Sequence, residues 1–295
     1  MFFKKQKSLP QKKSQKILII GDSPLAFFLA HTLQINDISV SFLIRPQNSM
    51  KPKLDKHLMF KNTSFQTTRF LISYTDDLLT KADFCIIASS LEKYKQDFLL
   101  LQNLFSNNIP ILNFAHIYNH RLFANYKEKN IIPAYFTGWL NYEKEMLEMV
   151  NNKSIINLCC SPKDFENYKT LFKNPLIEIK NISPQKFHLW KHLAPFIISN
   201  LLLAAHPKDL SKTLSQKDNR DLVSSAIKEV CALAEKENET LKESDLSAYL
   251  YTIPTQYKSE FLKQKSLFTL LDTLPQISYF ETPSLYKLFC LANTH

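Results

Sequence analysis

The sequence predicts an α/β domain with a mostly parallel sheet, followed by an all-helical C-terminal domain. Short apolar runs alternate with helical periodicity up to residue 182, and only helical periodicities follow. The composition, 45% hydrophobic and 22% charged over 295 residues, is that of a folded chain with a substantial core. We therefore expect a basic tail (1–15), an α/β domain (16–182) and a helical domain (183–295).

The individual elements follow from these patterns. Strands are predicted where apolar runs lie between turn residues: Ile17–Ile20, Ile38–Ile44, Phe70–Ser73, Phe84–Ala88, Ile111–Phe114, Ile132–Phe136, Ile155–Cys159 and Leu176–Ile179. Helices are predicted over Leu25–Leu33, Tyr94–Leu104, Pro184–His206, Arg220–Asn238, Ser244–Tyr251, Ser259–Leu271 and Ser284–Leu291. Strands that alternate with helices form βαβ units, whose ligands bind at the carboxyl ends of the strands.

Charge and cysteine usage exclude several classes of function. Six lysines up to Lys16 account for +6 of the net charge of +10, which leaves +4 on the rest of the chain. With no zinc-finger or helix-turn-helix pattern, we expect no nucleic-acid partner. Five cysteines without a CxxC spacing predict buried reduced thiols and no metal site. No apolar run could span a membrane and the start is unlike a signal peptide, so we expect a cytoplasmic protein.

Gly21 is the first candidate site residue, because it is one of only two glycines and ends the first apolar run. At such a strand-to-helix corner, N–H groups at the helix start can hold a phosphate. The dinucleotide fingerprint G-x-G-x-x-G is matched here as Gly21-Asp22-Ser23-Pro24-Leu25-Ala26. Ser23 in place of the second glycine crowds a pyrophosphate but adds a hydroxyl donor. The alternative is the plain buried first strand of any α/β protein.

Four further candidate residues follow later strands. Arg45 ends the second strand, where an arginine can pair with a 2′-phosphate and so selects NADPH, although an exposed cation there is common. Ser89 and Ser90 either line the cofactor's diphosphate or ribose or cap the next helix. His116 follows the Ile111–Phe114 strand and lies at the mouth of the cleft if it is functional; a lone histidine is more often structural.

The start of the helical domain carries the most informative segment. It reads Leu189-Trp190-Lys191-His192-Leu193-Ala194-Pro195-Phe196-Ile197-Ile198-Ser199-Asn200. His192, Phe196 and Asn200 share one helix face, whereas Lys191 is rotated by about 100° from His192. We therefore expect that Lys191 and His192 do not both face the cleft unless Pro195 kinks the helix. Either cation can donate a proton or orient a carboxylate; the alternative is a helix end with two solvated cations.

This segment resembles the motif L-W-x-K-L-x-x-N-x-x-x-N-P-L of ketopantoate reductases, through Leu189, Trp190, Leu193 and Asn200, with Asn181 before it. The resemblance implies a Rossmann-type domain followed by a helical domain of the 6-phosphogluconate dehydrogenase-like kind. At the family's catalytic lysine this chain has His192, with Lys191 one residue earlier. The family's substrate-binding asparagine falls on His116, and its carboxylate-binding serine has its nearest counterpart in Thr255.

The resemblance implies NADPH-dependent reduction of 2-dehydropantoate (ketopantoate) to pantoate, in the biosynthesis of pantothenate and coenzyme A. Lys191 or His192 would protonate the new hydroxyl, and Asn200 and Thr255 would hold the substrate's polar groups. A homodimer is compatible with this assignment. The alternatives are a catalytically inactive, nucleotide-binding relative and a dehydrogenase of another 2-hydroxy acid.

Overall fold

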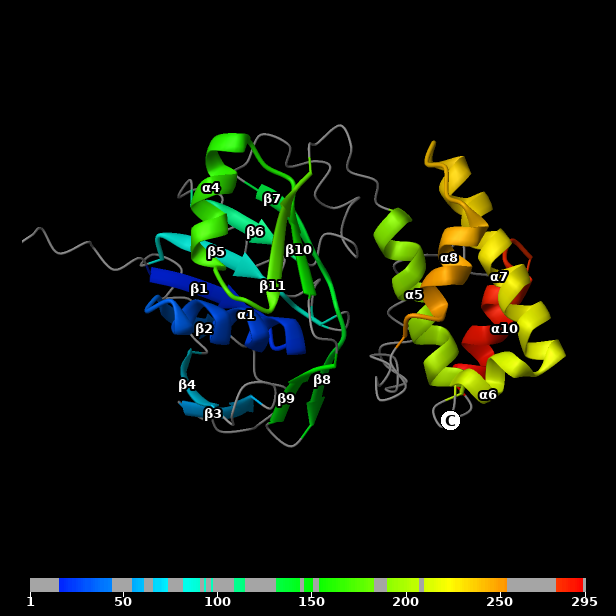
Figure 1. The fold of residues 1–295 in the computed structure, drawn as a ribbon, viewed down its shortest axis with the longest axis horizontal. Helices are drawn as coiled ribbons and strands as arrows, with labels where there is room; N and C mark the ends of the chain where they lie inside the picture. Colours follow the sequence, from blue (N-terminus) through cyan, green and yellow to red (C-terminus); the bar gives the residue numbers. More distant parts are fainter. Residues whose placement is uncertain are drawn as a thin grey trace, which may run out of the picture.

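A computed structural model describes residues 16–43, 55–60, 66–73, 82–90, 93, 97, 109–114, 131–143, 146–150, 154–182, 190–206, 210–253 and 280–293. The strands with α1 and α4 form one lobe, and the helices from α5 onward form the other (Figure 1). None of the described helices is long and apolar enough to cross a membrane.

The strands are, in chain order, β1 (Lys16–Ile20), β2 (Ser39–Leu43), β3 (Asp55–Phe60), β4 (Gln66–Ser73), β5 (Phe84–Ile87), β6 (Ile111–Asn113), β7 (Ile131–Thr137), β8 (Leu140–Glu143), β9 (Met146–Met149), β10 (Ser154–Leu158) and β11 (Ile177–Asn181). The described helices are α1 (Pro24–Ile35), α4 (Pro162–Leu171), α5 (Trp190–Ala205), α6 (Leu210–Ser215), α7 (Lys217–Lys236), α8 (Glu243–Leu250) and α10 (Pro283–Ala292).

The sheet confirms the predicted fold class. Its order is β11-β10-β7-β6-β5-β1-β2-β4-β3-β9-β8, and every pair from β4 through β2, β1, β5 and β6 to β7 is parallel. This central order is that of the doubly wound dinucleotide-binding fold, whose order reverses between β1 and β5. Ligands of such sheets bind outside the carboxyl ends of the strands at this reversal.

The side chains of β1 are buried on both faces of the sheet. Ile17 and Ile19 belong to the apolar cluster around α1, which contains Phe27 and Phe28. Leu18 and Ile20 point the other way, into a cluster that extends to the residues of α5. A strand covered on both faces reads as a continuous apolar run, which is why β1 is recognisable in the sequence. Each fully buried side chain of this size contributes roughly 1.5–3 kcal/mol.

Three strands, β3, β8 and β9, are absent from the predicted set. β8 and β9 form an antiparallel hairpin, and β9 extends the sheet by pairing with β3. The sequence of β9, Met-Leu-Glu-Met, consists of good helix formers, so sheet pairing overrides local propensity there. The helices α4 and α6 are also absent from the predicted set.

The other predicted helices agree in type with those observed and differ by a few residues at their ends. The described part of α5 begins at Trp190, and the predicted residues before 190 lie outside the described part of the chain. Tyr94–Leu104, apart from Asp97, and Ser259–Leu271 also lie outside it.

Candidate functional site: a cavity between the sheet and helix α5

Gly21 forms the corner between β1 and α1, with a φ of +118°. A Cβ atom built there would lie 2.6 Å from the carbonyl oxygen of Ala88 and 2.7 Å from Cα of Ser89. The glycine is required because the backbone that follows β5 passes directly against the corner. The close approach that the sequence indicated is therefore made by the neighbouring strand end.

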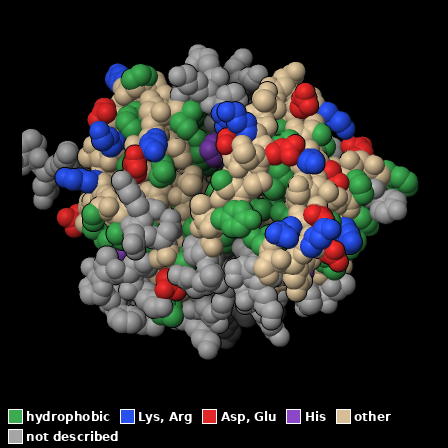
Figure 2. All heavy atoms as spheres, turned by 45° about the vertical axis from the view of Figure 1, so that its right-hand side comes forward, with side chains coloured by type: hydrophobic (Ala, Val, Ile, Leu, Met, Phe, Trp, Pro, Cys, Tyr) green, Lys and Arg blue, Asp and Glu red, His purple; other side chains and the backbone are tan. Residues whose placement is uncertain are grey.

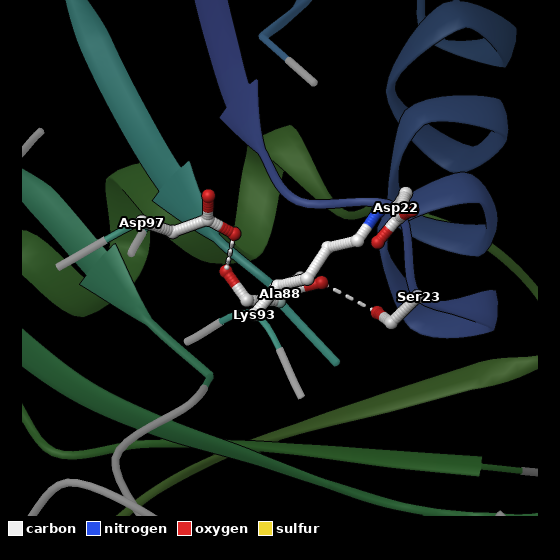
Figure 3. A network of polar contacts seen from close by, with 6 residues as sticks. Asp22, Ser23, Ala88, Lys93 and Asp97 are labelled. Carbon is white, nitrogen blue, oxygen red and sulfur yellow. Dashed lines mark hydrogen bonds and ion pairs between the residues drawn. The ribbon is translucent and has the colours of Figure 1, made fainter. Parts of the chain in front are cut away.

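Ser23 ties the same two strand ends together. Its hydroxyl accepts a hydrogen bond from the N–H of Ala26 at 3.1 Å, which caps α1, and donates to the carbonyl of Ala88 at 2.5 Å (Figure 3). The hydroxyl proton that we expected to serve a pyrophosphate is thus directed to the chain itself. Pro24 has no N–H, so among the first three residues of α1 only Leu25 keeps an N–H that the cap does not use.

Two acidic side chains complete the polar contacts at this corner. Asp22 forms an ion pair with Lys93, whose Nζ lies 2.5 Å from Oδ2 (Figure 3). Ser89 donates its hydroxyl to the buried carboxylate of Asp97 at 2.6 Å. Ser90 accepts a backbone hydrogen bond from Lys93. Its role as cofactor ligand or helix cap stays a prediction.

A cavity of about 310 Å³ opens beside this corner and lies between the two lobes. The α/β lobe contributes residues that follow β1, β5 and β6, together with the end of β7, the start of β8 and the turn between them. The helical lobe lines it with one side of α5 and with Tyr249 of α8. The lining residues are Ser23, Pro24, Leu25, Ala88, Ser89, Phe114, Tyr135, Phe136, Thr137, Gly138, Trp139, Leu140, Lys191, His192, Pro195, Phe196, Ser199, Asn200 and Tyr249.

Lys191 and His192 of α5 both line this cavity, whereas their rotation of about 100° on the helix predicted that only one of them faces it unless Pro195 kinks the helix. Two neighbouring rows of side chains on α5 line the cavity. Pro195 and Phe196 follow Lys191 and His192 one helical turn later, and Ser199 and Asn200 follow after a further turn. Pro195 also lacks the N–H that would bond the carbonyl of Lys191, which weakens the helix where the cavity meets it.

The two cations differ in their surroundings. Lys191 is exposed, whereas His192 is half-buried and packs on Tyr135 of β7 with ring centroids 3.4 Å apart. Burial, followed by the neighbouring Cys159, raises the pKa of Tyr135, so its phenol stays protonated and can donate a hydrogen bond at physiological pH. The contact with the ring of Tyr135 places the imidazole of His192 against the α/β lobe.

Asn200 is buried deeper in the same helix. It is 1% exposed, lines the cavity and donates its amide N–H to the carbonyl of Phe196 at 3.0 Å. Trp190 anchors the start of α5 through its Nε1, which donates to Glu237 at 3.1 Å, and its backbone N–H, which donates to Glu239 at 2.9 Å. The predicted Trp and Asn positions therefore have separate tasks: one fixes the helix and the other faces the cavity.

Three predicted site residues, Arg45, His116 and Thr255, lie outside the described residues, so their roles stay predictions. The structure also brings to the site several residues that were not among the candidates from the sequence: Lys93, Tyr135, Thr137, Gly138, Trp139 and Tyr249. Gly138 had a usable signal, because it is the second of the two glycines in the chain. Among the described residues, no three His, Cys, Asp or Glu side chains are grouped so as to hold a metal ion.

No known family profile and no curated protein matches this sequence. Solved structures do match its fold over nearly the whole length. A ketopantoate reductase from Ralstonia eutropha has a TM-score of 0.74 at 13% identity, with 95% of this chain and 98% of that chain covered. The chain has the fold of a ketopantoate reductase. A 2-dehydropantoate 2-reductase from Geobacter metallireducens has a TM-score of 0.69 at 16% identity, covering 95% and 99%.

The same fold occurs in D-mandelate dehydrogenase, solved with NADH and anilino(oxo)acetate. Its TM-score is 0.71 at 13% identity, and the match covers 95% of this chain and 97% of that chain. An enzyme named for D-mandelate thus has the same fold as the ketopantoate reductases. At such identities the likeness concerns the architecture, and substrate and cofactor have to be argued from the site.

Proposed function

We propose that this chain is an NADPH-dependent reductase of a 2-keto acid, with ketopantoate as the first candidate substrate and pantoate as the product. The observation that carries the proposal is the cavity, because a single hollow is lined both by the dinucleotide-type corner after β1 and by the cations of α5. A nucleotide-binding corner and a proton donor on opposite walls are what a keto-acid reductase requires.

The corner after β1 is the proposed binding place of the cofactor's diphosphate. It offers the N-terminal end of α1 with the N–H of Leu25, and the hollow reaches Ser23, Pro24 and Ser89. When bound, the reduced nicotinamide supplies a hydride to the keto carbon. Gly21, Asp22 and Arg45 belong to the same proposed cofactor site, and Arg45 is the proposed partner of a 2′-phosphate.

The chain's own residues then stabilise and protonate the oxygen of the substrate. Lys191 and His192 both border the cavity, so each can supply the proton or the positive charge that a developing alkoxide needs. Asn200 presents a polar group on the same face of α5, and Thr255 and His116 are the further proposed substrate contacts. The buried rings of Phe114, Tyr135 and Trp139 give this part of the lining an apolar character.

A second candidate substrate is a 2-keto acid with an aromatic side chain. The observation that favours it is the lining of the cavity, which contains Phe114, Tyr135, Phe136, Trp139, Phe196 and Tyr249. Aromatic rings stack favourably on one another and offer fewer hydrogen bonds to a hydroxylated substrate such as ketopantoate. An aromatic keto acid such as phenylpyruvate therefore belongs in the first substrate panel.

The test is oxidation of NADPH by the purified chain with ketopantoate and with phenylpyruvate, repeated with NADH. We expect turnover of a keto acid with NADPH, and a loss of roughly 10²–10⁴-fold in kcat in Lys191→Met or His192→Asn, whichever removes the proton donor. The other variant should mainly raise KM if its residue orients the carboxylate. Binding of NADPH without turnover of either acid would favour the inactive relative instead.

A homodimer is part of the proposal, since a Staphylococcus aureus ketopantoate reductase described as dimeric has the same fold with a TM-score of 0.65. The mass in solution tests it.

A further inference from the structure

Asp22 places a negative charge in the turn where the proposed diphosphate would bind. It follows Gly21 directly and precedes Ser23, the N-cap of α1. Its side chain is 27% exposed, so the carboxylate is only partly hydrated. A carboxylate at this position repels a bound diphosphate, and it does so more strongly in a half-buried corner than in water.

Lys93 lies against this carboxylate. The two residues are 71 positions apart in the chain, and the lysine side chain is the more buried partner, at 14% exposed. In Figure 3 the lysine reaches from the segment after β5 across to the turn that carries Asp22. Its single positive charge matches the single negative charge of the turn.

Other contacts hold the lysine in this position. Its backbone N–H donates to the carbonyl of Ser90 at 3.1 Å, and its own carbonyl accepts from the N–H of Asp97 at 3.0 Å. Asp97 in turn accepts the hydroxyl of Ser89, the residue against which Gly21 packs. The backbone of Lys93 is thus tied to the end of β5 before any ligand binds.

Among the described residues of this corner, the start of α1 offers few backbone N–H groups to an anion. Pro24 contributes no N–H, and the N–H of Ala26 is used by Ser23. The balance of charge between Asp22 and Lys93 therefore has more influence on a bound phosphate than it would at a helix start with all its N–H groups available.

We propose that Lys93 is a positioning residue of the cofactor site, which neutralises Asp22 and thereby allows the diphosphate of a dinucleotide to occupy the corner. This inference rests on the proposed function. Lys93 acts through Asp22. Removal of the lysine should therefore weaken binding of the dinucleotide mainly when residue 22 carries a negative charge.

The experiment is a double-mutant cycle on NADPH affinity, measured by the fluorescence of the nicotinamide. The variants are Lys93→Met, Asp22→Asn and the double variant. The matched control is Lys236→Met, which breaks an exposed ion pair with Glu281 on the helical lobe. We expect Lys93→Met to weaken binding about tenfold, the effect of one uncompensated charge near a phosphate. Asp22→Asn removes the repelling charge and leaves Lys93 without its counter-charge, so this variant should bind NADPH at least as tightly as the wild type. The control should stay within about threefold of the wild type.

The double variant decides the mechanism. If Lys93 acts by neutralising Asp22, adding Asp22→Asn to Lys93→Met should restore most of the lost NADPH affinity. Added salt should then reduce the difference in affinity between Lys93→Met and the wild type. A double variant as weak as Lys93→Met overturns the proposal, and so does a Lys93→Met protein that binds like the wild type. Thermal unfolding checks that each variant is folded. A wild-type chain that binds neither NADPH nor NADH contradicts the proposed function itself, before Lys93 is tested.

Discussion

At the scale of single residues, both glycines of the chain belong to the proposed site. Gly21 forms the cofactor corner, and Gly138 lines the cavity at the turn from β7 to β8. The two are needed for different reasons. Gly21 has a positive φ and faces backbone atoms that cannot move aside, whereas a Cβ at Gly138 would meet the side chains of Phe136 and Ser154.

Gly21→Ala should therefore lower the free energy of unfolding more than Gly138→Ala does. We expect the first to lower the free energy of unfolding by at least roughly 2 kcal/mol, because it adds backbone strain to overpacking. The second should cost roughly 1 kcal/mol, since side chains can shift. Urea unfolding of both variants measures the difference, and an equal loss in the two would show that the corner is not strained.

At the scale of elements, α1 is buried along most of its length, including a histidine. His31 is 4% exposed among the apolar residues of the helix. Burial lowers its pKa from 6.5 to about 4, because the charged imidazolium is disfavoured away from water. The neutral ring is thus part of the packing between α1 and the sheet.

This predicts a dependence of stability on pH. The folded pKa of His31 is depressed, so its contribution is complete above about pH 6.5 and is lost as the pH falls toward 4, where the unfolded chain takes up the proton first. Between pH 7.5 and pH 5 the loss is about 2 kcal/mol. In His31→Gln the fall in unfolding free energy over this interval should be smaller by that amount. A slope identical to that of the wild type would contradict the assignment.

At the scale of the whole molecule, the two lobes meet through aromatic pairs at the cavity. Tyr135 packs on His192 of α5, and Trp139 contacts Tyr249 of α8 with ring centroids 5.5 Å apart. Burial raises the pKa of Tyr249, which keeps the phenol neutral in this interface. On the face drawn in Figure 2, basic and acidic side chains are interspersed over the described residues of both lobes.

The Trp139–Tyr249 contact should couple the lobes by about 1 kcal/mol. A double-mutant cycle with Trp139→Leu and Tyr249→Leu, followed by urea unfolding, measures this coupling. The control cycle pairs Trp139→Leu with Tyr286→Leu, because Tyr286 stacks on Phe289 within α10. That cycle should be additive within about 0.5 kcal/mol. Additivity in both cycles would mean that the rings do not hold the lobes together.

The fold was largely predictable because buried elements have a periodic pattern of apolar residues. This pattern makes it possible to recognise β1, β2, β5 and the long helices of the second lobe, since each buries apolar side chains at the spacing that its geometry sets. The hairpin of β8 and β9 lacks such a hydrophobic pattern, because its strands are stabilised by pairing with β3 and with each other. In the proposed site, the sequence indicated those placements that depend on local order, such as Gly21 and Ser23 at the corner and His192, Phe196 and Asn200 along one face of α5. The roles of these residues stay predictions.

By itself, the sequence determined the fold class, most of the strands and helices in their order, the glycine at the first corner and the cations at the start of α5. Only the tertiary structure decided their partners. Ser23 bonds to Ala88 from 65 residues away, Asp22 to Lys93 from 71, and His192 packs on Tyr135 across the lobes. The physical reason is that periodicity encodes which face of an element is buried. The sheet order that places the ends of β1 and β5 side by side is set by all the strands together.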